Sequence, residues 1–157
     1  MIWRALLVLV LSATSGFAQN FQGYQDTSLD AVFEQWDAIT KNYASGVSVM
    51  RPQNIKFVAT YQVPPQSCSN GALEGVLRTV GLAHILKQVS ITNCVGLRSE
   101  RGRDVLAYVQ DMLVPGLKAD ARIGGQIEVH ANLFAYVVNA DRARNAPIML
   151  VSAFEPK

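Results

Sequence analysis

Hydrophobic residues recur at helical spacing near the start of the chain, over residues 28 to 44. The apolar positions are Leu29, Val32, Phe33, Trp36, Ile39 and Tyr43. Thr27 or Ser28 can cap this segment, and Asp30 lies in its first turn, where the helix dipole favours a negative charge. Asp30, Glu34, Asp37 and Lys41 occupy the opposite face. The pattern predicts an amphipathic helix with a solvated charged face, on which Asp37 and Lys41 pair at i,i+4.

The next apolar segments have the character of strands. We predict strands over 47–50 and 55–63, separated by the residues 51–54, and expect Pro64 and Pro65 to end the second because proline cannot donate to the ladder. A second helical pattern covers 72–87. Ser69 or Asn70 can cap it, and Gly75 and Gly81 interrupt it.

Four more strands are predicted in the second half of the chain, at 89–98, 103–110, 126–139 and 147–154. The first two form a hairpin through residues 99–102, and a short helix follows to about residue 119. Residues 105–113 also fit a helix, but the turn signal before them favours a strand. In the segment 126–139, apolar residues from Ile127 to Val137 alternate with the other face, which carries Glu128, His130, Asn132, Phe134, Tyr136 and Val138.

These elements predict an α+β fold. An N-terminal amphipathic helix and a second helix pack on a mainly antiparallel sheet, within a single domain over 19–157. The order of hairpin, short helix and hairpin in the C-terminal half resembles small barrels such as the OB-fold. No residue motif points to a particular family.

The first 18 residues have the pattern of a cleavable secretory signal peptide. Arg4 precedes an apolar run from Ala5 to Leu11, which is too short to span a bilayer. Gly16 and Ala18 are small residues two apart, as signal peptidase requires, so cleavage is expected after Ala18. We expect a periplasmic or secreted protein. No N-glycosylation acceptor occurs, which leans toward the periplasm.

Composition and charge exclude several classes of protein. Half of the 157 residues are apolar and 17% are charged, which is typical of a folded chain. Loss of residues 1–18 would remove only Arg4 among the charged residues, leaving 13 basic and 12 acidic side chains. A net charge of +1 gives no general attraction to nucleic acid, and no membrane span is expected in the mature chain.

Cys68 and Cys94 are the two cysteines of the chain. In an exported protein such a pair is expected to form a disulfide, which would stabilise the fold by about 3 to 4 kcal/mol. A reactive thiol is the alternative, but neither cysteine lies in a redox motif of the Cys-x-x-Cys type. Neither a metal site nor a cofactor is expected.

The first candidate ligand-binding face is the row Glu128, His130, Asn132, Phe134 and Tyr136. Polar groups beside aromatic rings are typical of recognition surfaces, and equally of a strand covered by a helix. Glutamate and histidine can also serve as acid–base groups or zinc ligands, although a zinc site needs three or four ligands.

The second candidate is a set of loop arginines. Arg98, Arg101 and Arg103 surround one predicted turn, and Arg142 and Arg144 lie in the loop 139–146. If the two loops meet, their guanidinium groups could bind an acidic small molecule, an acidic polysaccharide or an acidic protein surface. The alternative is that these arginines only solubilise the loop tips.

The sequence therefore favours an exported, non-enzymatic accessory or binding protein of unknown ligand. An inhibitor or immunity-type protein directed against a hydrolase is a second possibility. A small secreted hydrolase that uses His130 and Glu128 is a third. No nucleophile elbow, phosphate loop or zinc-protease motif occurs in the sequence.

Overall fold

The computed structural model describes residues 23–138 and 147–157, and it confirms the α+β class. The predicted signal peptide lies outside these residues. The elements are β1 Gln25–Asp26, α1 Leu29–Asn42, β2 Gly46–Ser67, α2 Gly71–Thr79, α3 Ile85–Gln88, β3 Asn93–Arg98, β4 Asp104–Val109, a 3-10 turn Asp111–Leu113, α4 Val114–Asp120, β5 Gln126–Val138 and β6 Pro147–Pro156. Within the described ranges, no helix has the length and apolarity needed to cross a membrane.

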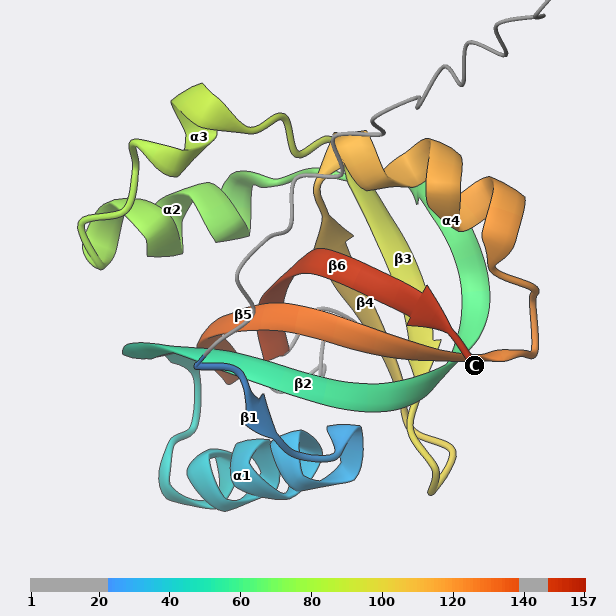
Figure 1. Ribbon diagram of the computed structural model, residues 1–157. Helices are drawn as coiled ribbons and strands as arrows, with labels where there is room; N and C mark the ends of the chain where they lie inside the picture. Colours follow the sequence, from blue (N-terminus) through green and yellow to red (C-terminus); the bar gives the residue numbers. More distant parts are fainter. Residues whose placement is uncertain (1–22, 139–146) are drawn as a thin grey trace, which may run out of the picture.

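The strands form one mixed sheet that returns on itself (Figure 1). Their order is β1-β2-β3-β4-β6-β5, and an additional pairing of β2 with β5 closes a ring of five strands. The β1–β2 and β4–β6 pairs are parallel and the others are antiparallel. The ring is not evenly arranged round an axis. The barrel-like ring includes β2, so it is not confined to the C-terminal half, where the sequence predicted a small barrel.

The strand β2 is one continuous element of 22 residues, so the predicted break at 51–54 is wrong. Its first part pairs with β5 and its last part with β3. The prolines are accommodated at irregularities in the pairing: Pro52 lies in the bulge between Val49 and Gln53, and Pro64–Pro65 in the bulge between Val63 and Gln66. A bulge leaves a residue outside the ladder, which is where a proline can lie within a strand.

The helix α1 matches its prediction closely. Ser28 is the N-cap, and its hydroxyl accepts a hydrogen bond from the Ala31 N–H at 3.0 Å. The apolar stripe predicted from the sequence is buried from Leu29 to Trp36. α1 lies below β2 in Figure 1, and its buried stripe belongs to the main core inside the ring.

The second predicted helix is two helices, α2 and α3. The chain turns at Gly81, whose φ of 77° is a left-handed conformation that glycine adopts without strain. Asn70 is the N-cap residue of α2, but its side chain donates to the Ile91 carbonyl rather than to the helix. The two helices therefore form a small layer over one side of the ring (Figure 1).

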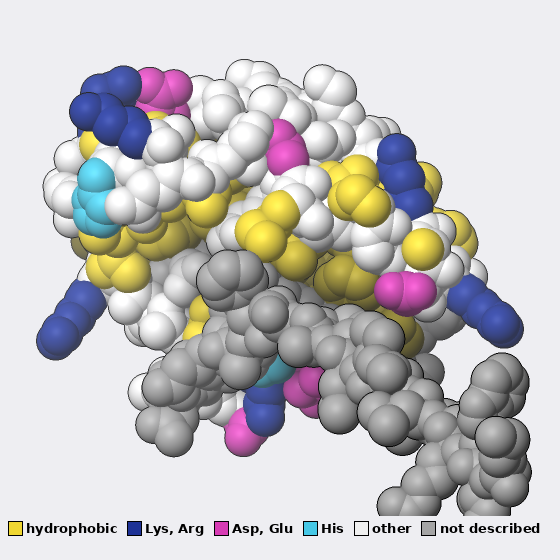
Figure 2. All heavy atoms as spheres, turned by 45° about the horizontal axis from the view of Figure 1, so that its top comes forward, with side chains coloured by type: hydrophobic (Ala, Val, Ile, Leu, Met, Phe, Trp, Pro, Cys, Tyr) yellow, Lys and Arg dark blue, Asp and Glu magenta, His cyan; other side chains and the backbone are white. Residues whose placement is uncertain are grey.

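A second, smaller core lies between this layer and the outer face of the strands. Leu73 and Leu77 of α2 pack there with Tyr108 of β4, Phe134 of β5 and Ile148 of β6. Figure 2 shows this side of the molecule, where hydrophobic side chains are visible beneath α2 and α3 and charged ones lie mainly toward the margins. The sheet is thus buried on both faces in this region, although the alternation in 126–139 predicted one polar face.

A disulfide joins Cys68 and Cys94, as predicted from the cysteine count. Cys68 follows the last residue of β2, and Cys94 lies in β3 with its side chain buried in the second core. The Cys68 N–H also donates to the Thr92 carbonyl at 3.0 Å. The bridge therefore fixes the exit of β2 against β3, at the point where the chain leaves the ring for α2.

Asp111 fixes the segment that enters β3. One carboxylate oxygen accepts from the Ser90 and Thr92 hydroxyls at 2.6 and 2.8 Å. The other accepts from the Thr92 N–H and the Asn93 amide at 2.9 and 3.0 Å. Burial alone would raise the pKa of Asp111, but these four hydrogen bonds outweigh it and lower the pKa well below its ordinary value.

We predict that Asp111→Ala lowers the free energy of unfolding by about 1 to 3 kcal/mol at pH 7, since four donors lose a charged acceptor. Because the folded-state pKa is lowered, this stabilisation is present above the unfolded pKa and is lost as the pH falls toward the folded value. Urea unfolding at several pH values measures both effects. Asp120→Ala, at an exposed carboxylate in α4, is the control and should have little effect. Equal losses for the two variants would contradict this role.

Candidate binding groove

The first three residues of the predicted β5 row make internal contacts. Glu128 forms an ion pair with Lys157 at 2.8 Å, and this contact lowers the pKa of Glu128. The Asn132 amide donates to the Asn54 side chain at 2.6 Å and accepts from the Ser152 hydroxyl at 2.7 Å. Both side chains thus tie β5 to its neighbouring strands.

His130 is buried, with 7% of its surface exposed. The Tyr24 ring lies edge-on against it, with 5.1 Å between the ring centroids. Burial is the main influence on the pKa of His130 and lowers it, whereas the Glu128 carboxylate opposes the shift. At neutral pH the imidazole is therefore neutral and beneath Tyr24, a poor position from which to reach a substrate.

Phe134 lies on the same face as the row but is covered there, whereas Tyr136 lies on the opposite face. Both are buried, with 2% and 0% exposed, and they face different cores. The β5–β6 register shifts between Leu133 and Ala135, and this bulge reverses the alternation. Phe134 keeps the outer face and packs under α2. Tyr136, beyond the bulge, lies in the main core instead, and its hydroxyl donates to Gln35 of α1 at 2.9 Å. Of the two alternatives left by the sequence, an exposed recognition surface or a strand covered by a helix, the burial of both rings supports the second.

The described arginines also make internal contacts. Arg103 forms two hydrogen bonds with the Asp37 carboxylate, at 2.6 and 3.0 Å, and its guanidinium carbon lies 4.3 Å from the centroid of the Phe33 ring. Arg101 pairs with Glu34 at 2.7 Å. The hairpin between β3 and β4 is thus held against the acidic face of α1. Asp37, expected to pair with Lys41, pairs with Arg103 instead.

Arg98 forms a two-point ion pair with Asp104 across the β3–β4 ladder, at 2.7 and 3.0 Å. Each partner shifts the pKa of the other in the direction that keeps it charged: the hydrogen bond raises that of Arg98 and lowers that of Asp104. Arg142 and Arg144 lie outside the described residues. Whether the two arginine loops meet therefore stays a prediction.

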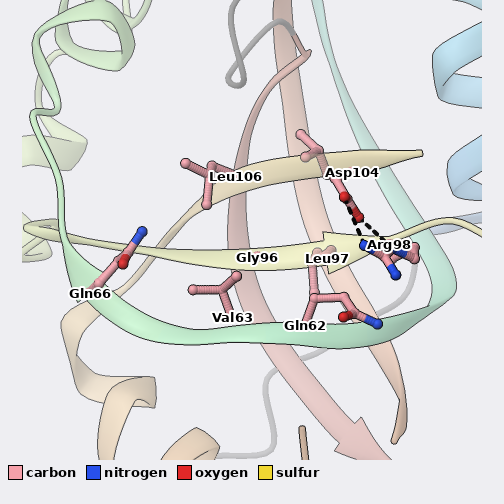
Figure 3. Close-up of a pocket in the computed structure, with 9 residues that line it drawn as sticks. Gln62, Val63, Gln66, Gly96, Leu97, Arg98, Asp104 and Leu106 are labelled. Carbon is pink, nitrogen blue, oxygen red and sulfur yellow. Dashed lines mark hydrogen bonds and ion pairs between the residues drawn. The ribbon is translucent and has the colours of Figure 1, made fainter. Parts of the chain in front are cut away.

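A groove opens beside the Arg98–Asp104 pair, on the outer face of β2, β3 and β4 (Figure 3). Its volume is about 310 Å³. The lining residues are Gln62, Val63, Gln66, Gly96, Leu97, Arg98, Asp104, Val105 and Leu106. Figure 3 shows Val63 and Leu106 on either side of Gly96, Gln66 at one end, and the ion pair at the other. Of these lining residues, only Arg98 was a candidate from the sequence, because neither the glutamines nor the aliphatic residues form a motif.

The floor of the groove depends on Gly96. A Cβ atom at this position would lie 2.5 Å from Val63 Cβ and 3.1 Å from the Val63 backbone nitrogen. No side chain fits at those distances, so glycine is required where β2 bulges across β3. At this point the Val63 side chain packs directly on the Gly96 backbone and forms part of the floor.

The described part of the chain contains no cluster of three or more histidine, cysteine, aspartate or glutamate side chains that could hold a metal ion. The groove itself offers one carboxylate, already paired, together with two amides. Its chemistry is that of neutral hydrogen bonding beside an apolar surface. No protein-family model matches the chain, and no curated protein matches it in sequence.

We predict that Gly96→Ala lowers the free energy of unfolding by about 1 to 3 kcal/mol, because the new methyl group must displace Val63 and the β2 backbone. Gly75→Ala is the matched control, since a Cβ there meets nothing within 4 Å and α2 gains a better helix former. The control should be neutral or slightly stabilising. A fully stable Gly96→Ala protein would show that the close approach of the two strands is wrong.

We also predict that Arg103 stabilises the fold. Arg103→Ala should cost about 1 to 2 kcal/mol, because it removes a two-point ion pair and the packing over Phe33. Arg101→Ala should cost under about 0.5 kcal/mol, since its pair with Glu34 is largely exposed. Thermal unfolding of both variants measures the difference. An unchanged melting temperature for Arg103→Ala would leave this arginine available as a ligand-binding group.

Proposed function

We propose that the chain is an exported, non-enzymatic accessory protein that binds an uncharged, extended segment of a partner protein in the β2–β3–β4 groove. One observation carries this proposal: an aliphatic surface is bordered by polar side chains that have no net charge, namely an ion pair and two glutamines. We call these polar side chains the rim of the groove. The signal-peptide pattern of residues 1–18 supports export, and the Cys68–Cys94 disulfide is compatible with it.

The rim favours a ligand without net charge. Arg98 and Asp104 neutralise each other, yet their side chains remain 44% and 59% exposed. Each can therefore make one more hydrogen bond, the guanidinium as donor and the carboxylate as acceptor. Gln62 and Gln66 each offer both a donor and an acceptor. A peptide group, with one N–H and one C=O, matches these paired functions.

The floor favours a peptide over a sugar. Its side chains are aliphatic, from Val63 and Leu106, and among the described lining residues none is an aromatic on which a pyranose ring could stack. An aliphatic side chain of an extended segment would instead rest against Val63 and Leu106. A volume of about 310 Å³ is at the lower end for ligand pockets and suits one such side chain with its adjoining main chain.

The charged groups of the groove support binding over catalysis. Asp104 is held in its ionised form by Arg98, so it is a poor general acid at neutral pH. Neither glutamine is a nucleophile or a base. His130 and Glu128, which the hydrolase hypothesis would use, do not line the groove.

The test uses a displayed library of random eight-residue peptides selected on the purified protein. We predict that peptides of low charge with a central aliphatic residue are enriched, and that the best of them shifts the backbone amide resonances of Gln62, Gln66 and Gly96. The double variant Arg98→Ala/Asp104→Ala should weaken this peptide by about tenfold, or about 1.4 kcal/mol, since a good polar contact contributes that much.

The matched control is Glu74→Ala/Arg78→Ala, which removes an ion pair on α2 and also leaves the net charge unchanged. It should bind the peptide as the parent does. Both double variants should keep the melting temperature of the parent, because exposed ion pairs contribute little to stability. Enrichment of acidic peptides only, or resonance shifts confined to another surface, would overturn the proposal.

A further inference from the structure

The first five residues of β2, Gly46–Met50, form an edge of the sheet. Their backbone pairs with β5 on one side, from Gly46 opposite Val138 to Val49 opposite Ala135. On the other side β1 pairs with β2 only at Ile55 and Lys56. Figure 1 shows this end of β2 extending well past β1. In the described ranges, the second edge of Gly46–Met50 thus has no strand beside it.

The side chains of this edge are apolar and exposed. Val47 is 53% exposed and Val49 is 39% exposed, and the two lie two residues apart on one face of the strand. Their partners on β5 are Val137 and Ala135, which lie on the same face of the sheet and contact the second core. The edge is therefore the open end of an apolar surface that is covered elsewhere.

The edge has none of the usual protection against strand pairing. Natural proteins interrupt exposed edges with lysine, proline or a bulge. The segment Tyr43–Met50 contains no charged residue and no proline, and the bulge begins only after Val49. Arg51 and Pro52 follow directly, so the unprotected length is sharply limited.

We propose that a second copy of this chain pairs antiparallel with the edge Gly46–Met50, about a two-fold axis through Ser48. This arrangement places Val47 opposite Val49 of the second copy, and Val49 opposite its Val47. The edge is then complementary to itself, as a two-fold interface requires. Four valines make one apolar cluster on one face of the joined sheets, and the backbone groups of both edges are paired.

A second copy fits this edge better than an unrelated partner because the segment offers no charge with which to select one. Cross-strand valine pairs are favourable contacts that the symmetry repeats twice. Pairing over five residues covers less surface than a standard interface, so the dimer is concentration-dependent. The groove of the proposed function lies near the other end of β2 and stays open in such a dimer.

The experiment is analytical ultracentrifugation of the purified, disulfide-intact protein from about 1 µM to about 1 mM, a range that covers weak dimers. A monomer–dimer equilibrium is expected. Val47→Lys should raise the dissociation constant at least about tenfold, because the Val47–Val49 contact occurs twice in the symmetric dimer and both copies of it are lost. Val58→Lys is the control: Val58 is 44% exposed on the same strand, beside Glu128 and away from the edge. It should associate as the parent does.

Hydrogen exchange separates a second copy from cover by the chain itself. Alternate amides of Gly46–Met50 are already bonded to β5 in the monomer, so the informative amides are those that point away from β5. In the dimer these outward amides become protected only as the protein concentration rises. Protection of the outward amides that is already complete in the monomer would mean that another part of the same chain covers the edge, and would overturn the proposal. A monomer over the whole range, or a Val47→Lys protein that dimerises as the parent does, would overturn it as well.

Discussion

The fold depends on the pairing of one strand with two partners. β2 pairs with β5 through its first part and with β3 through its last part, and these two ladders close the ring. A strand of 22 residues cannot stay straight round such a ring, so it bends at its bulges. The local requirements along it follow from this bending: prolines at the irregular positions, and Gly96 where β2 crosses close over β3. The disulfide then fixes the end of β2 to β3.

The ring also explains how the helices are distributed. α1 covers the main core. Its start is attached to β2 by the hydrogen bond from the Thr27 N–H to the Lys56 carbonyl, and its acidic face is attached to the β3–β4 hairpin. α2 and α3 cover part of the outer face of the strands and create a second core there. The part of the outer face that they leave open, beside Gly96 and Leu106, is the groove. The binding surface is therefore the uncovered remainder of a sheet that is otherwise packed on both faces.

Local patterns in the sequence predicted most of the elements. The cap at Ser28, the apolar stripe of α1, the hairpin at 99–102 and the disulfide all depend on neighbouring residues or on a count of cysteines, so they could be predicted. The continuity of β2 could not, because Pro52 and Pro64 are tolerated only through pairing with strands distant in sequence. The predicted alternation of the two faces of β5 is wrong beyond Phe134 for a related reason. One bulge near Phe134 reverses the alternation, and no residue type marks that bulge in the sequence.

Only Arg98 of the groove could be predicted from the sequence, because charge is the feature of a binding site that a single sequence displays. Six ion pairs occur among the described residues, and they engage Arg98, Arg101 and Arg103 as well as Glu128. A ligand recognised by one of these charges would first have to break an existing pair and leave its partner exposed. A neutral ligand has no such cost, because it can add hydrogen bonds to groups that are already balanced. In this protein the charged side chains hold the elements together, and recognition is left to amides, backbone and aliphatic surface, which carry no motif in the sequence.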